Sequence, residues 1–248
     1  MENPFHYRNK AQYPLGLNKE NEPVVGIFAQ RSHEIIPMEK CLIQKPISEE
    51  IAKTILEFIK QNKISIYNEK TGKGLFRHIV IKVGVKTNEI MCILVINGKQ
   101  IPKETELVEM LIKKYPNIKT IVKNINTKNT NVILGLENIN IYGNGYIEDK
   151  LGEYKFKISP LSFYQVNPIQ AERLYNIGVE AAKITSNDGQ NPPVVPPTYP
   201  PVVSAEDSIV VPSTGANMNY AFPTIVGIVS LVILGIGVFV IKKKIIEK

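Results

Sequence analysis

This sequence has no tryptophan and few residues that form disulfides or bind metals, with only three histidines and two cysteines. Cys41 and Cys92 form no Cys-x-x-Cys pair, which excludes a fold held together by a disulfide framework. The first ten residues are polar and lack the apolar core of a secretory signal, so we expect no export leader there. Tyr67 and Gly74 replace the first glycine and the Ser/Thr of a phosphate-binding loop, which excludes that motif around Lys73.

Positive charge, by contrast, is in excess, and the whole excess lies in one part of the chain. Residues 1–185 hold 26 Lys and Arg against 19 Asp and Glu, a surplus of seven, whereas the remainder holds four of each. A basic globular region attracts polyanions, and RNA is a natural candidate. A charge surplus that serves only solubility is the alternative.

The first 185 residues predict an α+β domain. Residues 75–85 and 89–97 are apolar runs separated by a short polar link, which predicts a β-hairpin. Residues 6–16 and 23–36 predict a second pair of strands across a polar loop. Further strands are expected at 119–126, 139–143 and 153–159. Antiparallel strands with few helices are typical of this fold class.

Three helices are expected in the same region. Ser48, followed by two glutamates, predicts an N-cap with acidic residues in the first turn. A second helix fits residues 103–115 and ends before a proline. Asn167-Pro168 predicts the third, with asparagine as N-cap and proline at the first helical position. The first helix has one apolar face, made by Ile51, Ile55 and Ile59.

Six short motifs follow one another in this region. In order they are NPFHYRNKAQYPLG (3–16), RSHEII (31–36), CLIQ (41–44), TGKGLFRH (71–78), TNVILG (130–135) and ISPLSFYQVNP (158–168). Together they resemble the RNA (uracil-5-)-methyltransferases, the family that includes the 23S rRNA enzymes. The resemblance implies an α+β central domain, which in the family lies between an RNA-binding barrel and a Rossmann-like domain that binds S-adenosylmethionine.

The resemblance ends at Thr185, before the family's catalytic domain. It implies that the nucleophilic cysteine and the methyl-donor site lie beyond the matched region, and no later segment offers a strand, a glycine-rich turn and a helix in succession. Cys92 lies in the apolar run EIMCILVIN and is expected to be a small buried hydrophobe. We therefore expect no catalytic residue in this chain, and a fragment that binds RNA without transferring a methyl group.

Two positions carry ligand roles in the family. The resemblance implies that Gln165 touches the methyl donor, and a polar side chain bonded to local backbone is the alternative. Cys41 stands where many family members place the fourth cysteine of a [4Fe-4S] cluster. The other three come from a segment upstream of Met1, so Cys41 is an orphan ligand position and no cluster is expected.

The candidates for RNA contact are basic residues within the motifs. Arg77 and His78 are adjacent, so in a regular strand they would point to opposite faces. Phe163 and Tyr164 are aromatics that can stack on a base or pack within the domain. We expect phosphate contacts, rather than ordinary surface charge, at Arg8, Lys10, Arg31, His33, Arg77 and His78.

The composition changes at Ser186. Residues 186–221 are rich in proline and nearly uncharged at first, which predicts an extended, disordered linker. Residues 222–241 carry no charge and, as a helix, would rise about 30 Å, which predicts a transmembrane helix. A basic tail, 242–248, follows with three consecutive lysines, which predicts a cytoplasmic C-terminus.

Before this span lies VPSTG, made of Val211, Pro212, Ser213, Thr214 and Gly215, which resembles a sortase cell-wall sorting signal with valine in place of the first leucine. A sortase and the membrane are thus candidate partners of residues 186–248. RNA is the candidate partner of residues 1–185, which we call the head. The leading interpretation is a methyltransferase fragment, and a chimeric reading frame is the simplest account of its fusion to this tail. Its location stays open between the membrane, through the C-terminal helix, and the cytoplasm, as in the family. The alternative is a surface protein anchored in the membrane or cell wall.

Overall fold

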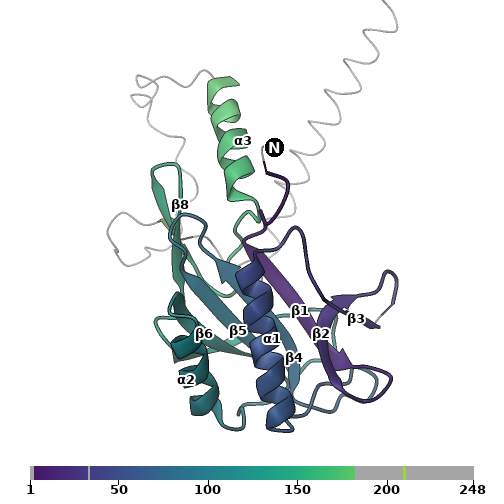
Figure 1. The fold of residues 1–248 in the computed structure, drawn as a ribbon. Coiled ribbons are helices and arrows are strands. Elements are labelled where there is room, and N and C mark those ends of the chain that lie inside the picture. Colours follow the sequence, from purple (N-terminus) through teal and green to yellow (C-terminus); the bar gives the residue numbers. More distant parts are fainter. Residues whose placement is uncertain (1–2, 33, 182–208, 211–248) are drawn as a thin grey trace, which may run out of the picture. The chain divides into compact units, whose positions relative to one another are not determined.

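A seven-stranded sheet forms the centre of the domain (Figure 1). The computed structural model describes residues 3–32, 34–181 and 209–210. The strand order is β3-β2-β1-β4-β5-β6-β7, and every neighbouring pair is antiparallel except β5 and β6. The strands are β1 Lys10–Leu17, β2 Pro23–Phe28, β3 Ile35–Pro37, β4 Phe76–Val83, β5 Ile90–Ile96, β6 Ile118–Ile125 and β7 Glu137–Tyr142.

The α+β class is confirmed, with a mixed rather than a fully antiparallel sheet. The parallel pair β5–β6 requires a crossover, and α2 (Glu104–Lys114) provides it. The predicted strand 23–36 is instead two strands, β2 and β3, that pair with each other. They are separated by a turn in which Arg31 has a φ of 58°, a left-handed conformation that no regular strand contains.

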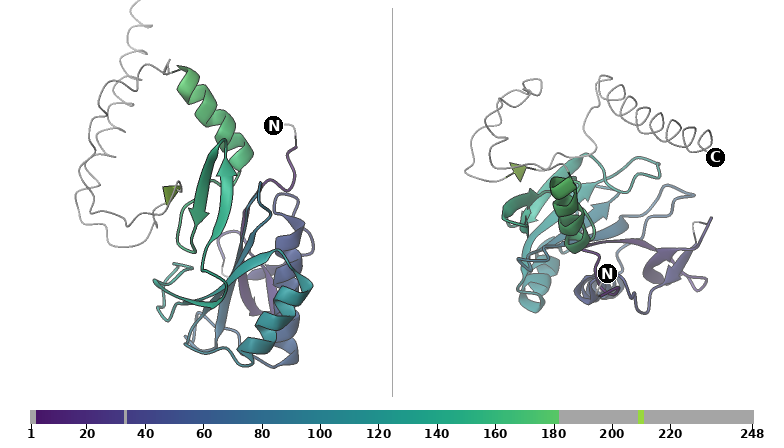
Figure 2. Two further views of the ribbon diagram at one scale, coloured as in Figure 1. Left: turned by 90° about the vertical axis from the view of Figure 1, so that its left-hand side faces the viewer. Right: turned by 90° about the horizontal axis from the view of Figure 1, so that it is seen from above.

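Helices α1 (Pro46–Gln61) and α2 cover one face of the sheet (Figure 2). The predicted apolar face of α1 is confirmed, since its three isoleucines are fully buried in the core with Ile79 and Ile81 of β4. Burying each such side chain stabilises the fold by about 1.5–3 kcal/mol. This face is closed by packing, so it offers no polar groups to a ligand.

The predicted N-cap at Ser48 is wrong. The helix begins at Pro46, whose fixed φ suits the first helical position, with Lys45 as the capping residue. Ser48 is buried in the first turn, and its N–H donates to the Lys45 carbonyl at 3.0 Å. At α3 (Pro168–Ala181) the prediction is confirmed, because the Asn167 Oδ1 accepts the Gln170 N–H at 3.1 Å.

A smaller sheet lies against the other face (Figure 2). Its strands β8 (Ile147–Leu151) and β9 (Tyr154–Ile158) pack Ile147 and Ile158 onto apolar residues of β4, β5 and β6. The sequence IEDKL gave no clear strand signal because it contains buried Asp149. That carboxylate accepts the N–H groups of Val85 at 2.9 Å and Lys86 at 2.8 Å, which satisfies it inside the fold.

Part of the predicted linker takes part in this sheet. Ile209–Val210 form β10, which pairs in parallel with β9. The linker prediction did not anticipate this pair, because an apolar β-branched dipeptide can add to an open strand edge without any local signal. None of the helices in the described part of the chain has the length and apolar composition of a membrane span. The predicted span 222–241, the basic tail and the VPSTG segment lie outside the described residues.

Candidate functional site

The six motifs gather at the two ends of β1. This strand starts near α3 and runs to the opposite end of the sheet (Figure 1). Over its eight residues it spans about 25 Å. We call the surroundings of its first residues the anchor site, and a cavity beside its last residues the base cavity.

At the anchor site, the first motif is bonded to the last. The Asn9 N–H donates to the Val166 carbonyl at 3.0 Å, and the Asn9 amide donates to the Gln165 carbonyl at 2.9 Å. Asn9 is buried, so these two bonds are shielded from water. A loop 156 residues away in sequence is thereby fixed to the start of β1.

Lys82 also fixes this loop, through hydrogen bonds from the neighbouring strand β4. It lies on β4 opposite Lys10, and its Nζ donates to the carbonyls of Ser159 at 2.8 Å and Ser162 at 2.9 Å. Burial, followed by the charge of Lys10, lowers the pKa of Lys82 to about 7. A neutral amine has two hydrogens, which matches the two carbonyl acceptors.

The loop exposes one aromatic ring and packs the other, which is half-buried, against the smaller sheet. Phe163 is 54% exposed and Gln165 is exposed beside it. Tyr164 instead packs on Phe156, with ring centroids 5.8 Å apart, and its hydroxyl donates to Asp149. Burial, followed by the Asp149 carboxylate, raises the pKa of Tyr164. Of the two predicted stacking residues, only Phe163 is placed to meet a base.

The CLIQ motif lies beside the start of the chain. The N–H groups of His6 and Arg8 donate to the carbonyls of Leu42 at 2.8 Å and Ile43 at 2.9 Å. Cys41 is half-buried, and its N–H donates to Glu49 at 3.2 Å. In the described part of the chain, no three His, Cys, Asp or Glu side chains come together as metal ligands. One thiol does not hold an iron–sulfur cluster, so the role of Cys41 as a ligand stays a family-based prediction.

The Gln165 side chain is exposed on the anchored loop. It lines neither the base cavity nor a second hollow beside α1. The donor contact of Gln165 therefore stays a family-based prediction. Cys92, as predicted, is fully buried on β5, and burial raises its pKa to about 12.

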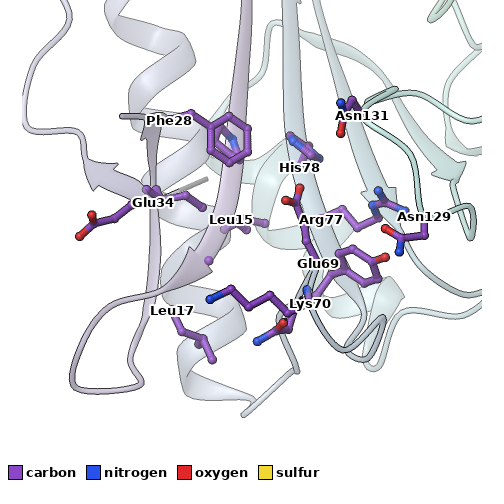
Figure 3. A pocket seen from close by; sticks show the side chains of 15 residues that line it. Leu15, Leu17, Phe28, Glu34, Glu69, Lys70, Arg77, His78, Asn129 and Asn131 are labelled. Atoms are coloured by element: carbon purple, nitrogen blue, oxygen red, sulfur yellow. Dashed lines mark hydrogen bonds between the residues drawn. The ribbon is translucent and has the colours of Figure 1, made fainter. Parts of the chain in front are cut away.

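The base cavity has a volume of about 520 Å³ (Figure 3). Four of the six motifs contribute to its walls, through Pro14–Gly16, through Glu34, through Arg77 and His78, and through Asn131. The end of β1 and the turn after Tyr67 complete it. Residues more than 100 positions apart in sequence thus surround one space.

A β-bulge brings Arg77 and His78 to this cavity together. Phe76 pairs with Ile96 and His78 pairs with Val95, so Arg77 is an extra residue with no partner position on β5. Phe76 therefore faces the helix-covered core, and the next two side chains both face the other way. The expectation that the two side chains point to opposite faces is wrong for this reason.

Arg77 is committed to the protein interior. Its guanidinium donates to the carbonyls of Asn126 at 2.8 Å and Lys128 at 2.7 Å, and lies 4.2 Å from the centre of the Tyr67 ring. The residue is only 3% exposed. This geometry does not fit the predicted phosphate contact. It gives Arg77 the role of fixing the loop that precedes TNVILG.

Two asparagines that sequence reasoning missed hold the rest of that loop. The Asn126 amide donates to the carbonyls of Val132 at 2.7 Å and Ile133 at 3.0 Å. Asn124 bonds Gly135 in both directions, at 2.7 and 2.9 Å. A Cβ at Gly135 would lie 1.8 Å from a backbone oxygen. The available signal was two asparagines at alternate positions at the end of an apolar strand.

His78 is buried without a partner. It is 6% exposed, and neither ring nitrogen has a hydrogen-bond partner among the described residues. Phe28 meets its ring edge-on at 6.2 Å. Burial, followed by the charge of Arg77, lowers the pKa of His78 to about 4, so the imidazole is neutral near pH 7.

The predicted phosphate contacts do not form one patch. Arg8 and Lys10 lie at the anchor site, where burial, followed by the charge of Arg8, lowers the pKa of Lys10. Arg31 is exposed in the turn between β2 and β3. His33 lies outside the described residues, and Arg77 and His78 lie at the base cavity.

Comparison with known proteins finds relatives for most of the chain. An uncharacterized RNA methyltransferase of Caldanaerobacter subterraneus is 48% identical over 188 residues, which are 76% of this chain and 41% of the relative. Similar proteins of Staphylococcus aureus strain COL and of Clostridium acetobutylicum, with the same description, are 44% and 46% identical over 76% of this chain, and 42% and 41% of their own lengths are matched. No protein-family profile matches the chain.

A solved structure has the same fold over most of the described domain. It is the Pyrococcus abyssi tRNA (uracil-54, C5)-methyltransferase in complex with S-adenosyl-L-homocysteine, with a TM-score of 0.59 and 25% sequence identity. The match covers 71% of this chain and 41% of that one. The chain is thus similar to RNA methyltransferases, and it spans about two fifths of the length of the relatives it matches.

Proposed function

We propose that residues 3–181 form the RNA-contacting central domain of an RNA (uracil-5-)-methyltransferase. The observation that carries the proposal is the convergence of the six motifs on the anchor site and the base cavity, within a stretch 44–48% identical to RNA methyltransferases. Motifs that only maintained a core would have no reason to meet at polar sites on one face.

In this proposal RNA lies along β1 on the face opposite the helices, beside the smaller sheet that covers β4, β5 and β6. Arg8 and Lys10 contact phosphates at the anchor site, and Arg31 contacts them from the β2–β3 turn. Phosphate contacts fix the position of a nucleic acid, whereas aromatic and amide groups contact its bases. Phe163, half-exposed on the anchored loop, is the base-stacking residue of the anchor site.

The described domain does not supply the chemistry by itself. Cys92 is fully buried, and its raised pKa keeps it a thiol at neutral pH, so it is no substitute for a nucleophilic cysteine. S-adenosylmethionine is the methyl donor that the family implies, and the related solved structure holds its product form. We propose that this chain alone binds RNA and transfers no methyl group. Radiolabel moved from S-adenosylmethionine to carbon 5 of uracil by the chain alone would contradict this.

Helix α3 supports a place for the domain within a larger protein. Its apolar side chains are exposed along much of its length, at Leu174, Ile177 and Val179 among others. Such a surface is unfavourable in water and is typical of a contact with another domain. In the longer relatives, we propose that this helix packs against the domain that binds the methyl donor.

A membrane anchor is the second candidate function. The uncharged run 222–241 followed by three lysines favours it, and VPSTG at 211–215 is the candidate sortase signal. Recovery of the chain in the envelope fraction, with its head accessible to protease from outside, would favour this function. Recovery in a soluble fraction with RNA would favour the first.

Resequencing the codons for residues 185–189 tests the chimeric reading frame.

RNA binding is the direct test of the proposed function. The full chain in mild detergent should bind a single-stranded 12-nucleotide oligouridine, with an affinity that falls steeply between 50 and 200 mM salt. Replacing Arg8, Lys10 and Arg31 by alanine should lower the salt slope by about 0.7 for each lost phosphate contact. The matched control replaces three exposed lysines elsewhere, Lys60, Lys99 and Lys113, with the same change of charge. Equal effects of the two triple variants would refute the assignment.

A further inference from the structure

We propose that the base cavity binds one unpaired base of the RNA, with His78 and the amides of Asn129 and Asn131 contacting the edge of the base. The inference rests on the proposed function, because it assumes that RNA reaches this face. It goes beyond that function because it assigns one base of the RNA to the base cavity, whereas the proposed function assigns RNA contacts only to residues outside this cavity.

The cavity has the size and the rigidity of a binding pocket. Its volume of about 520 Å³ lies in the range typical of small-ligand sites. Asn97 donates to the carbonyls of Gly72 and Gly74, and the Asn68 side chain accepts the N–H groups of Lys70 and Thr71. The turn at the mouth is therefore held by its own hydrogen bonds. A pocket that is already formed loses little conformational entropy when a ligand enters.

The opposite wall is equally fixed. Arg77 bonds the carbonyls of Asn126 and Lys128, directly before Asn129. Asn126 ties down Val132 and Ile133, directly after Asn131. The segment that carries both asparagine side chains is thus clamped on each side. Within the described residues, neither of these two side-chain amides has a hydrogen-bond partner.

His78 is the buried lining residue whose whole polar group lacks a partner among the described residues. It is more than nine-tenths buried, lines the cavity (Figure 3), and has no hydrogen-bond partner at either ring nitrogen in the described part of the chain. Buried polar groups without partners are rare in proteins, since leaving them unsatisfied costs stability. A neutral imidazole carries one donor and one acceptor, and a base edge carries both kinds of group.

The charges of the lining favour a base over a phosphate. The guanidinium of Arg77 is directed at carbonyl oxygens. The positive charge of Lys70 is balanced by the carboxylates of Glu34 and Glu69, which line the same cavity. A phosphate would require an excess of positive donors. A neutral group with polar edges and apolar faces suits this lining. Phe28, 39% exposed, adds an apolar ring to the wall, and Lys70 at the exposed mouth is placed for the adjoining phosphate.

The test compares two ligands with the same number of phosphates. The full chain is titrated with the oligouridine 12-mer and with a 12-residue abasic ribose-phosphate oligomer. Replacing Asn129 and Asn131 by alanine should weaken oligouridine binding about tenfold, since loss of contacts to one base has effects of this size. Binding of the abasic oligomer and the salt slope should not change. The exposed pair Asn117 and Asn144, replaced by alanine, is the matched control.

His78→Phe provides a second variant that keeps an aromatic ring and removes both nitrogens. It should weaken oligouridine about tenfold and leave the abasic oligomer unaffected. Variants that bind oligouridine as the wild type does, with the salt slope intact, would overturn the pocket while the proposed function stands. Absence of any salt-dependent RNA binding by the wild-type chain would overturn the proposed function itself.

Discussion

The anchor site and the base cavity lie on the same face of one sheet, at the two ends of β1, and differ in how their buried polar groups are satisfied. At the anchor site, Asn9 and Lys82 donate to four backbone carbonyls of a single loop. At the base cavity, the terminal nitrogens of Arg77 donate to carbonyls, but its Nε and both nitrogens of His78 have no partner in the described residues. The comparison indicates that Asn9 and Lys82 find their partners within the protein, whereas the His78 imidazole finds one only with a ligand.

The largest expected effect is loss of the Arg77 guanidinium. Arg77→Met would leave the carbonyls of Asn126 and Lys128 without their donors, so we expect the free energy of unfolding to fall by about 3 kcal/mol. Urea unfolding of the variant beside Lys113→Met, a change at an exposed lysine, measures this. Arg77→Lys should recover less than half of the loss, because an ammonium group cannot match the planar fork. A loss equal to that of Lys113→Met would mean that Arg77 does not hold the loop.

At the anchor site, Asn9→Ala should have a smaller effect. The variant keeps the backbone bond to Val166 and loses only the side-chain bond to Gln165. We expect a decrease of about 1–2 kcal/mol in the free energy of unfolding. Hydrogen exchange should also speed up in residues 158–168. If stability decreases as expected but hydrogen exchange in residues 158–168 does not change, other contacts hold the loop.

Lys82 should make stability depend on pH. Its pKa is about 7 in the folded protein and has its ordinary value of 10.5 in the unfolded chain. Between these values the unfolded chain binds a proton that the folded protein lacks, so stability rises as pH increases from 7 towards 10.5. Lys82→Met should flatten this rise relative to the wild type in urea unfolding at a series of pH values. A parallel pair of curves would contradict the assigned titration.

The smallest expected change in stability is at the base cavity. His78→Phe removes two buried nitrogens that have no partners, so the free energy of unfolding should stay equal or increase by up to about 1 kcal/mol. Thermal and urea unfolding of the variant measure this. A decrease as large as that of Asn9→Ala would indicate that His78 has a structural partner, and would remove the contrast between the two sites.

Sequence patterns predicted most of the fold, because long apolar runs and the Asn-Pro start of α3 are local signals. The apolar face of α1 and the hairpin of β4 and β5 follow from periodicity alone. The start of α1 was missed because the helix begins at Pro46, whose fixed φ suits the first helical position, and not after the better capping residue Ser48. Strand β8 was missed because the burial of Asp149 depends on backbone donors of a distant turn.

The candidate sites were less predictable than the fold. The motifs identified the right segments, but not which side chains face solvent. A single bulge residue at Arg77 changes the side on which it and His78 lie, and bulges have no reliable local sequence signal. The same bulge turns a predicted phosphate contact into a clamp for the loop that carries Asn129 and Asn131.

The measurement that tests the account most directly is photocrosslinking of the full chain to an RNA containing 4-thiouridine, followed by mapping of the linked peptides. The central claim is that RNA lies on the face opposite α1 and α2, between the anchor site and the base cavity. We predict crosslinks in the segments that contain Phe28, Tyr67 and Phe163, and their loss above 0.5 M salt. Crosslinks confined to α1 and α2, or spread evenly over both faces of the sheet, would contradict it.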